Sequence, residues 1–366
     1  MSADDAQPAL KEMFDAARYR QIAGLLADVH PGFDRKHFLA IATRGLDELT
    51  LLQRVRRTTE ACHTTLPQDY LPAVSILKKL APQLNHGFVS IFLADFVGQY
   101  GHDNFPASME ALSYFTRFGS SEFAIREFLR RNLARTLRVM EKWSRDPDEH
   151  VRRLASEGCR PRLPWSFQLT ELIADPSPVA PILENLRAES SLYVRKSVAN
   201  HLNDISKDHP DWMLNRLASW DLAQPHTQWI AKRAARSLIK AGHPRAFRLF
   251  GFTEKTAIQL SAFSLVPASL KIGGVLTLKF RLKSTADQSQ KIAVDYIVHY
   301  QKKSGKLSPK VFKLKETTLA AGADLTFSKH QRITDFTTRK HYPGRHEVEI
   351  MVNGTVLAKK SFTVTR

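Results

Sequence analysis

Cysteine and acidic side chains are both scarce in this chain of 366 residues. Its two cysteines, Cys62 and Cys159, exclude a disulfide framework and a four-ligand zinc site, as is usual in a reducing cytoplasm. Acids number 36 against 54 lysines and arginines, a net charge of +18 that indicates an acidic partner such as nucleic acid. No apolar run is long enough to span a bilayer, and residues 1–8 lack the basic and apolar regions of a signal peptide. We therefore expect a cytoplasmic protein that is neither exported nor membrane-bound.

Residues 9–240 are predicted to be helical, because apolar residues recur at spacings of three and four between proline and glycine punctuation. From residue 108 onward the helices are expected in pairs. The second helices of three later pairs carry the basic doublets Arg152–Arg153, Arg195–Lys196 and Lys232–Arg233, which are 43 and then 37 residues apart. Two helices in about forty residues is the HEAT repeat length. The pattern predicts an α-α superhelical solenoid, and a plain helical bundle with coincidental doublets is the alternative.

After about residue 255 the apolar period changes to strict alternation, as in Leu276–Leu282 and Ile292–Tyr300. Alternation predicts half-buried strands of an antiparallel sheet, and Asn353-Gly354 predicts a tight hairpin between two of them. Six or seven strands in about 110 residues fit a small all-β immunoglobulin-like sandwich. We place the helical domain at residues 1–250 and the β domain at residues 256–366.

The predicted β domain is the more basic part of the chain. Residues 256–366 hold 19 lysines and arginines against 7 acids, which gives them +12 of the net charge of +18. Lys302, Lys303 and Lys306 fall in one short loop and are candidates for contact with phosphates. A solvated surface that only increases solubility explains these lysines nearly as well.

One predicted helix, residues 191–207, combines a basic face with an acid. Val194, Val198, Leu202 and Ile205 share one side, which must face a core. The opposite side carries the polar residues Lys196, Asn200, Asn203, Asp204 and Lys207. A carboxylate weakens an ordinary DNA-binding surface, because phosphates repel it. Asp204 therefore either pairs with its neighbours or meets a cation on the ligand.

A second unusual stretch, residues 151–165, surrounds Glu157 with four arginines and ends at Trp165. Taken singly, these residues have ordinary explanations: Glu157 pairs with Arg153 on an exposed helix, Trp165 is a core residue, and Glu122 favours a helix start. Taken together, the three acids and the tryptophan would lie at corresponding ends of successive second helices. They would then line one concave surface of the solenoid.

These motifs resemble the AlkC branch of the AlkD-like bacterial DNA alkylation repair glycosylases. The likeness rests on residues 121–126, 151–165, 192–210 and 229–243, and extends to residues 33–38 and 66–70. It implies a HEAT-like solenoid that removes N3-methylated bases, chiefly 3-methyladenine and 3-methylcytosine, from double-stranded DNA in base excision repair. It also implies recognition without full extrusion of the base, and some members carry a C-terminal immunoglobulin-like domain that grips DNA. We expect a monomer that needs no cofactor and no metal.

The resemblance also implies roles for individual residues. An N3-methylated base is cationic, and its departure leaves positive charge on the deoxyribose, which a carboxylate stabilises while it positions water. Glu157 and Asp204 would be the acids at the lesion, with Glu122 in support and Trp165 packed on the exposed nucleotide. Which acid orients the water stays open. The residues expected to hold DNA are Arg152, Arg153, Arg160, Arg162, Arg195, Lys196, Asn200, His201, Lys207, Trp229, Lys232, Arg233 and Arg236, with the three loop lysines of the β domain.

Two other functions fit the same sequence. A non-catalytic solenoid could clamp bent or damaged DNA through its concave face. A protein scaffold could present its basic faces to acidic proteins, and it would show no salt-dependent binding to DNA. Replacing the acids by amides separates the enzyme from the clamp, because only the enzyme loses base release.

Overall fold

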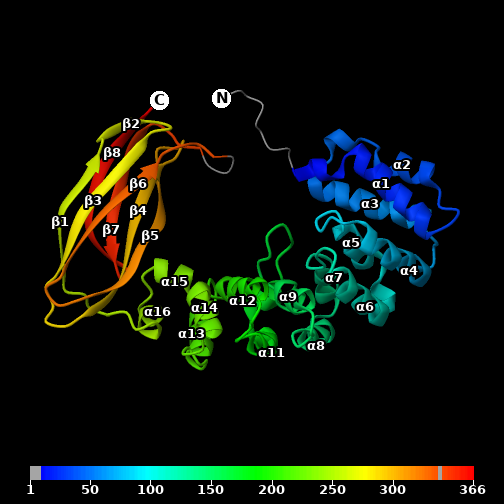
Figure 1. The fold of residues 1–366 in the computed structure, drawn as a ribbon, viewed down its shortest axis with the longest axis horizontal. Coiled ribbons are helices and arrows are strands. Elements are labelled where there is room, and N and C mark those ends of the chain that lie inside the picture. The colour runs from blue at the N-terminus through cyan, green and yellow to red at the C-terminus, as the bar shows by residue number, and fades with distance from the viewer. Residues whose placement is uncertain (1–9, 337–339) are drawn as a thin grey trace. The chain divides into compact units, whose positions relative to one another are not determined.

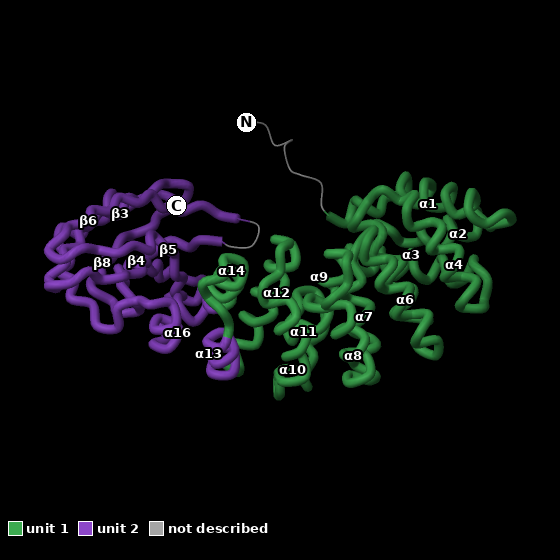
Figure 2. Tube along the Cα trace, turned by 60° about the horizontal axis from the view of Figure 1, so that its bottom comes forward, with its two compact units in different colours: residues 1–209, 220–234 green, residues 210–219, 235–366 purple. Residues whose placement is uncertain are grey.

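The structure, a computed structural model, describes residues 10–336 and 340–366. It confirms a solenoid-like helical region followed by an all-β domain, which run from blue to green and from yellow to red in Figure 1. Two compact units are coloured green and purple in Figure 2: residues 1–209 with 220–234, and residues 210–219 with 235–366. The N-terminal segment that argued against export lies outside the described residues. No helix of the described part is long and apolar enough to cross a membrane.

The first unit is built from helices whose apolar stripes face one another. Val194, Val198 and Leu202 are fully buried, as their spacing predicts. Helices are present at three of the four expected pairs, as α6 and α7, α8 and α9, and α11 and α12, and α12 packs against both α9 and α14. The second helix expected in the fourth pair is broken into α14 and α15. The helices of this unit are α1 (Ala16–Val29), α2 (Arg35–Ala42), α3 (Leu51–Thr65), α4 (Tyr70–Leu80), α5 (Ile91–Tyr100), α6 (Phe105–Phe115), α7 (Ala124–Arg131), α8 (Leu133–Trp143), α9 (Glu149–Glu157), α10 (Thr170–Ala174), α11 (Ala180–Asn185), α12 (Leu192–Ile205) and α14 (Pro225–Ala234).

The second unit is a β-sandwich preceded by short helices. Its three-stranded sheet has the order β1-β3-β6 and its five-stranded sheet the order β2-β8-β7-β4-β5. Leu276, Leu278 and Phe280 point into the core between exposed Lys279 and Arg281, as alternation predicts. The elements are α13 (Pro210–Ala218), α15 (Arg236–Lys240), α16 (Pro244–Leu249), β1 (Ile258–Val266), β2 (Ser269–Lys271), β3 (Val275–Ser284), β4 (Gln290–Gln301), β5 (Leu307–Leu319), β6 (Asp324–Arg332), β7 (Gly344–Val352) and β8 (Thr355–Thr365).

The predicted hairpin at Asn353-Gly354 joins β7 to β8. Both residues have positive φ, 45° and 80°, which is the requirement of a two-residue type I′ turn. The Asn353 side chain also donates to the carbonyl of Thr253 at 2.8 Å. A Cβ atom on Gly354 would lie 2.4 Å from the Cα of Gly242, so only glycine permits this close approach.

The contacts of Thr253 and Gly242 with the hairpin pack the segment from α15 to β1 against β7 and β8. The structure therefore groups residues 235–255 with the β domain. The sequence-based boundary at residues 250–256 stays a prediction.

Candidate active site

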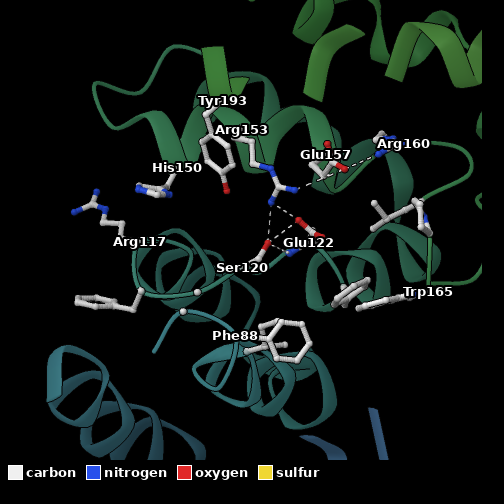
Figure 3. A pocket seen from close by; sticks show the side chains of 17 residues that line it. Phe88, Arg117, Ser120, Glu122, His150, Arg153, Glu157, Arg160, Trp165 and Tyr193 are labelled. Carbon is white, nitrogen blue, oxygen red and sulfur yellow. Dashed lines mark hydrogen bonds and ion pairs between the residues drawn. The ribbon is translucent and has the colours of Figure 1, made fainter. Parts of the chain in front are cut away.

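A cavity of about 640 Å³ lies in the first unit (Figure 3). Its walls come from the segment before α5, the turn between α6 and α7, one side of α9 with the segment after it, and the start of α12. Figure 3 places Arg117 and His150 at one end and Trp165 at the other. The charged and aromatic lining residues are Phe88, Arg117, Phe118, Glu122, Phe123, His150, Arg153, Glu157, Arg160, Trp165 and Tyr193.

Helix α9 presents Arg153 and Glu157 to this cavity. It begins at Asp148, whose carboxylate accepts from the backbone N–H groups of His150 at 2.8 Å and Val151 at 3.3 Å. Val151 and Leu154 are fully buried on the opposite side. Because residues four apart share a helix face, Arg153 and Glu157 emerge together.

The segment after α9 is held in place by a buried guanidinium that the sequence analysis did not single out. Arg126 of α7 is fully buried and donates to the carbonyls of Gly158 at 3.0 Å, Arg160 at 2.7 Å and Phe167. Burial lowers its pKa to about 10, so Arg126 keeps its charge at neutral pH. These bonds anchor both ends of the loop that carries Arg160 and Trp165.

Trp165 is exposed at the cavity rather than buried in a core. Its side chain is 61% exposed, and its backbone has a φ of 66°, in the left-handed region that residues with bulky side chains rarely adopt. Such strain persists where the surrounding structure enforces it, and it is common at functional sites. The position agrees with a residue that packs on a ligand.

Acidic and basic groups alternate through the site. Arg153 contacts the carboxylate of Glu122 directly and that of Glu157 at 3.7 Å, contacts visible in Figure 3. Arg160 donates from Nη1 to Glu157 at 2.6 Å. Its Nη2 and Nε atoms reach Asp204 at 2.7 and 2.9 Å, and Lys207 pairs with the same carboxylate at 3.0 Å. Three carboxylates are thus balanced by three cations.

The two arginines of this chain of ion pairs stay fully charged. Burial would lower the pKa of Arg153, but Glu122 and Glu157 outweigh burial and raise it. Burial acts in the same direction on Arg160, where Glu157 and Asp204 again raise the pKa. The acids therefore sit beside permanent positive charges, which fix their positions.

The three acids differ in the oxygens that they leave open. Both oxygens of Asp204 are engaged, and Glu157 accepts from Arg160 on one oxygen and from Ser197 at 2.6 Å on the other. Glu122 accepts from Ser120 at 2.7 Å and from Arg153 through Oε2, and its Oε1 atom has no hydrogen-bond partner within the described chain. Glu122 therefore keeps an oxygen for water or ligand.

Two expectations about the acids are wrong. Glu122 lies in the turn before α7, whereas Glu157 and Asp204 lie near the C-terminal ends of α9 and α12, so the three do not occupy corresponding helix ends. The ion pair of Glu157 is also not on an exposed helix, because Glu157 is 6% and Asp204 4% exposed. Asp204 does not line the cavity and meets it only through Arg160.

The residues expected to hold DNA differ in how exposed they are and in their partners within the protein. Three of them are exposed: Lys196 on α12, Lys207 just after α12, and Arg233 on α14. Arg152 and Arg162, like Lys207, have acidic partners within the protein. Arg152 donates to Glu189 at 2.8 and 2.9 Å, and Arg162 donates to Asp208 at 2.8 and 2.9 Å. These pairs join neighbouring segments of the solenoid.

Trp229 lies between two cations of the expected DNA-binding set. The guanidinium carbons of Arg195 and Arg233 lie 5.6 and 5.5 Å from its ring centroid. Arg195 also donates to the backbone carbonyls of Glu189 at 3.1 Å and Ser190 at 2.7 Å, which lie in the turn before α12. Asn200 and Lys232 are half-buried in the same unit, and Arg236 is half-buried in the second unit.

His201 was expected at the DNA surface, and this is wrong. Its side chain is fully buried, because it lies on the core side of α12 beside Leu202. Burial lowers its pKa to about 3, so the imidazole is neutral in the folded protein at physiological pH.

We expect His201 to make the protein sensitive to acid. Its pKa is about 3 when folded and about 6.5 when unfolded. The unfolded chain therefore binds the extra proton, and stability present above pH 6.5 is lost as pH falls toward 3. We expect the free energy of unfolding, measured with urea, to fall less steeply with pH in His201→Leu than in the wild type. The two slopes should differ by up to about 1.4 kcal/mol per pH unit. His37 is exposed, so His37→Leu is the control and should keep the wild-type pH dependence. If the plots of unfolding free energy against pH were parallel for the wild type and His201→Leu, the prediction would be contradicted.

Sequence reasoning missed the aromatic end of the cavity. The ring of Tyr193 lies 5.1 Å from the guanidinium carbon of Arg153 and 5.5 Å from the ring of His150. Tyr193 is 39% exposed at the start of α12, and the signal available in the sequence was an aromatic residue two positions before the basic doublet at 195–196. Phe88 and Arg117 come from turns that no sequence pattern marked.

The loop lysines of the β domain lie in the turn between β4 and β5. Lys302, Lys303 and Lys306 are all exposed. The backbone N–H of Lys302 donates to the carbonyl of Lys306 at 2.8 Å, and Gly305 provides a φ of 81°. The turn is thus closed, and it directs three cations to solvent.

Comparisons with known proteins match both parts of the chain. Residues 113–240 match a family described as "DNA alkylation repair enzyme", and residues 259–366 match the C-terminal Ig-like domain of uncharacterised protein YhaZ. The solved structure of Pseudomonas fluorescens alkylpurine DNA glycosylase AlkC, bound to DNA containing an abasic site analog, is similar with a TM-score of 0.96 and 52% identity, over 98% of this chain and 100% of that one. Uncharacterized protein YhaZ of Bacillus subtilis (strain 168) is 40% identical over 97% of this chain and 99% of its own length.

Proposed function

The chain belongs to the AlkC family of DNA alkylation repair glycosylases, and from this membership we propose that it hydrolyses the N-glycosidic bond of cationic N3-methylated bases in double-stranded DNA. The proposed substrates are 3-methyladenine and 3-methylcytosine. Water attacks C1′ of the deoxyribose, and the methylated base leaves without having been fully turned out of the helix, unlike the usual glycosylase route. The protein acts as a monomer.

The proposed chemistry is electrostatic. As the methylated base leaves, positive charge builds on the deoxyribose, and a fixed carboxylate stabilises that charge. Glu157 is fixed by Arg160 and Ser197, so it can act without reorganising. Glu122 orients the attacking water through its open oxygen. Asp204 acts through Arg160, which it holds in place.

One observation carries the proposal: two carboxylates and an exposed tryptophan line the same cavity of an otherwise basic chain. Trp165 packs on the nucleotide beside the lesion, and Arg153 and Arg160 keep the acids from repelling phosphates. The test is incubation of the purified chain with methylated duplex DNA and chromatography of the released bases. Release of neither base would overturn the proposal.

We also propose that the β domain contacts DNA through the turn between β4 and β5. Replacing Lys302, Lys303 and Lys306 together by alanine should weaken DNA binding and lower the slope of log K against log salt by up to about 3, because each lost phosphate contact removes about 0.9. Fluorescence anisotropy at several salt concentrations measures both quantities. Lys313→Ala, at a lysine that pairs with Glu316, is the control. An unchanged slope in the triple variant would exclude the turn from the interface.

A further inference from the structure

A second cavity of about 200 Å³ lies next to the candidate active site in the first unit. Both cavities are lined by Phe123 and Trp165, but the second extends toward α3 and α5. Neither Glu122 nor Glu157 lines it, although Ile91 and Ser120 also border both cavities.

The walls of the second cavity suit a flat aromatic ligand. Phe123, Trp165 and Phe167 contribute three rings, and aliphatic side chains of α3 and α5 add apolar surface. The polar lining residues are Arg56, Asp95, Gln99, Ser120, Glu127 and Ser166. Leu52 is 40% and Trp165 61% exposed, so both side chains are accessible to a ligand at the cavity. An apolar cavity of about 150 Å³ accommodates benzene. The larger volume here is enough for a nitrogen heterocycle with its substituents.

The polar side of this cavity offers an acceptor next to a donor. Asp95 accepts from Arg56 at 2.9 Å and from Thr59 at 2.7 Å, and its oxygens keep further lone pairs for a ligand N–H group. The Nε atom of Arg56 is buried and has no hydrogen-bond partner in the described part of the chain. A ligand that presents a donor beside an acceptor would satisfy both groups. The edge of a nucleobase has this arrangement.

We propose that the second cavity is a binding site for a planar nucleobase. Its position beside the candidate active site suggests two sources for that base, and this step rests on the proposed function. The base is either the methylated base just released or an unpaired base that remains in the DNA. In both cases its ring stacks between the aromatic side chains and its edge bonds to Asp95 and Arg56.

Equilibrium dialysis of the full chain against free 3-methyladenine tests the first source. Asp95→Asn should weaken binding at least about tenfold, since a charge-assisted hydrogen bond is lost. Leu52→Ala should weaken it about threefold through lost apolar contact. Leu71→Ala, at a 54% exposed leucine that lines neither cavity, and Glu157→Gln, in the first cavity alone, should leave the dissociation constant unchanged.

Abasic duplex DNA with 2-aminopurine opposite the abasic site tests the second source. The fluorescence of the probe changes when it leaves the DNA stack and enters the aromatic cavity, and Asp95→Asn and Leu52→Ala should reduce that change. A response in either assay supports the site and identifies the source of its base. Responses unaffected by both variants, or affected equally by Glu157→Gln, would overturn it. Absence of base release by the wild-type chain would contradict the proposed function alone, because binding of free base is measured independently.

Discussion

Replacing Glu157 by glutamine should slow the release of 3-methyladenine from methylated duplex DNA by about 10²–10³-fold, the usual cost of removing a preorganised electrostatic group. Glu122→Gln should have an effect of similar size, because its open oxygen is the proposed position for the water. Asp204→Asn should be milder, since Asp204 reaches the cavity only through Arg160. Single-turnover kinetics, with the released base quantified by chromatography, measures all three.

DNA affinity separates this mechanism from a non-catalytic clamp. The glutamine variants keep the shape of the side chain and remove a negative charge, so they should bind DNA as tightly as the wild type or more tightly. Glu110→Gln, at an exposed acid outside both cavities, is the matched control and should change neither quantity. Glu122→Gln and Glu157→Gln variants that excise at the wild-type rate would show that the carboxylates do not drive the reaction.

Periodicity was sufficient to predict the architecture. The three-and-four spacing of Val194, Val198 and Leu202 and the alternation of Leu276, Leu278 and Phe280 each correspond to a buried face. The short parallel strand β2 was missed, because three residues are too few to show a period. The grouping of α15 and α16 with the strands depends on the close approach of Gly242 to Gly354, which pattern cannot reveal.

The candidate site was predictable in composition but not in geometry. The sequence brought Glu122, Glu157 and Trp165 together as candidates, and the structure places all three in one cavity. It could not show that Asp204 is buried behind an arginine, because a helical wheel assigns a side but not what covers it. His201 is different, because its spacing of three residues after Val198 and four before Ile205 already placed it on the core side of α12.

Loss of Arg160 should destabilise the protein strongly. Its guanidinium is 9% exposed and joins Glu157 of α9 to Asp204 of α12, so its removal leaves two buried carboxylates short of a partner. Breaking such a buried pair costs about 3–5 kcal/mol. We expect Arg160→Met to lower the free energy of unfolding of the helical unit by that amount, measured by urea and circular dichroism at the helix band.

Two further variants show whether the stabilisation by Arg160 comes from the geometry of its guanidinium or from its charge alone. Arg162→Met removes an arginine two residues away that pairs with Asp208, but that pair is 25% and 30% exposed, so its loss should cost less than about 1 kcal/mol. Arg160→Lys keeps the charge but not the planar fork that reaches two acids at once, so it should fall between the wild type and Arg160→Met. Equal stability of Arg160→Lys and the wild type would mean that positive charge alone holds the acids. Equal losses for Arg160→Met and Arg162→Met would mean that the buried bridge contributes no more than an ion pair at the surface.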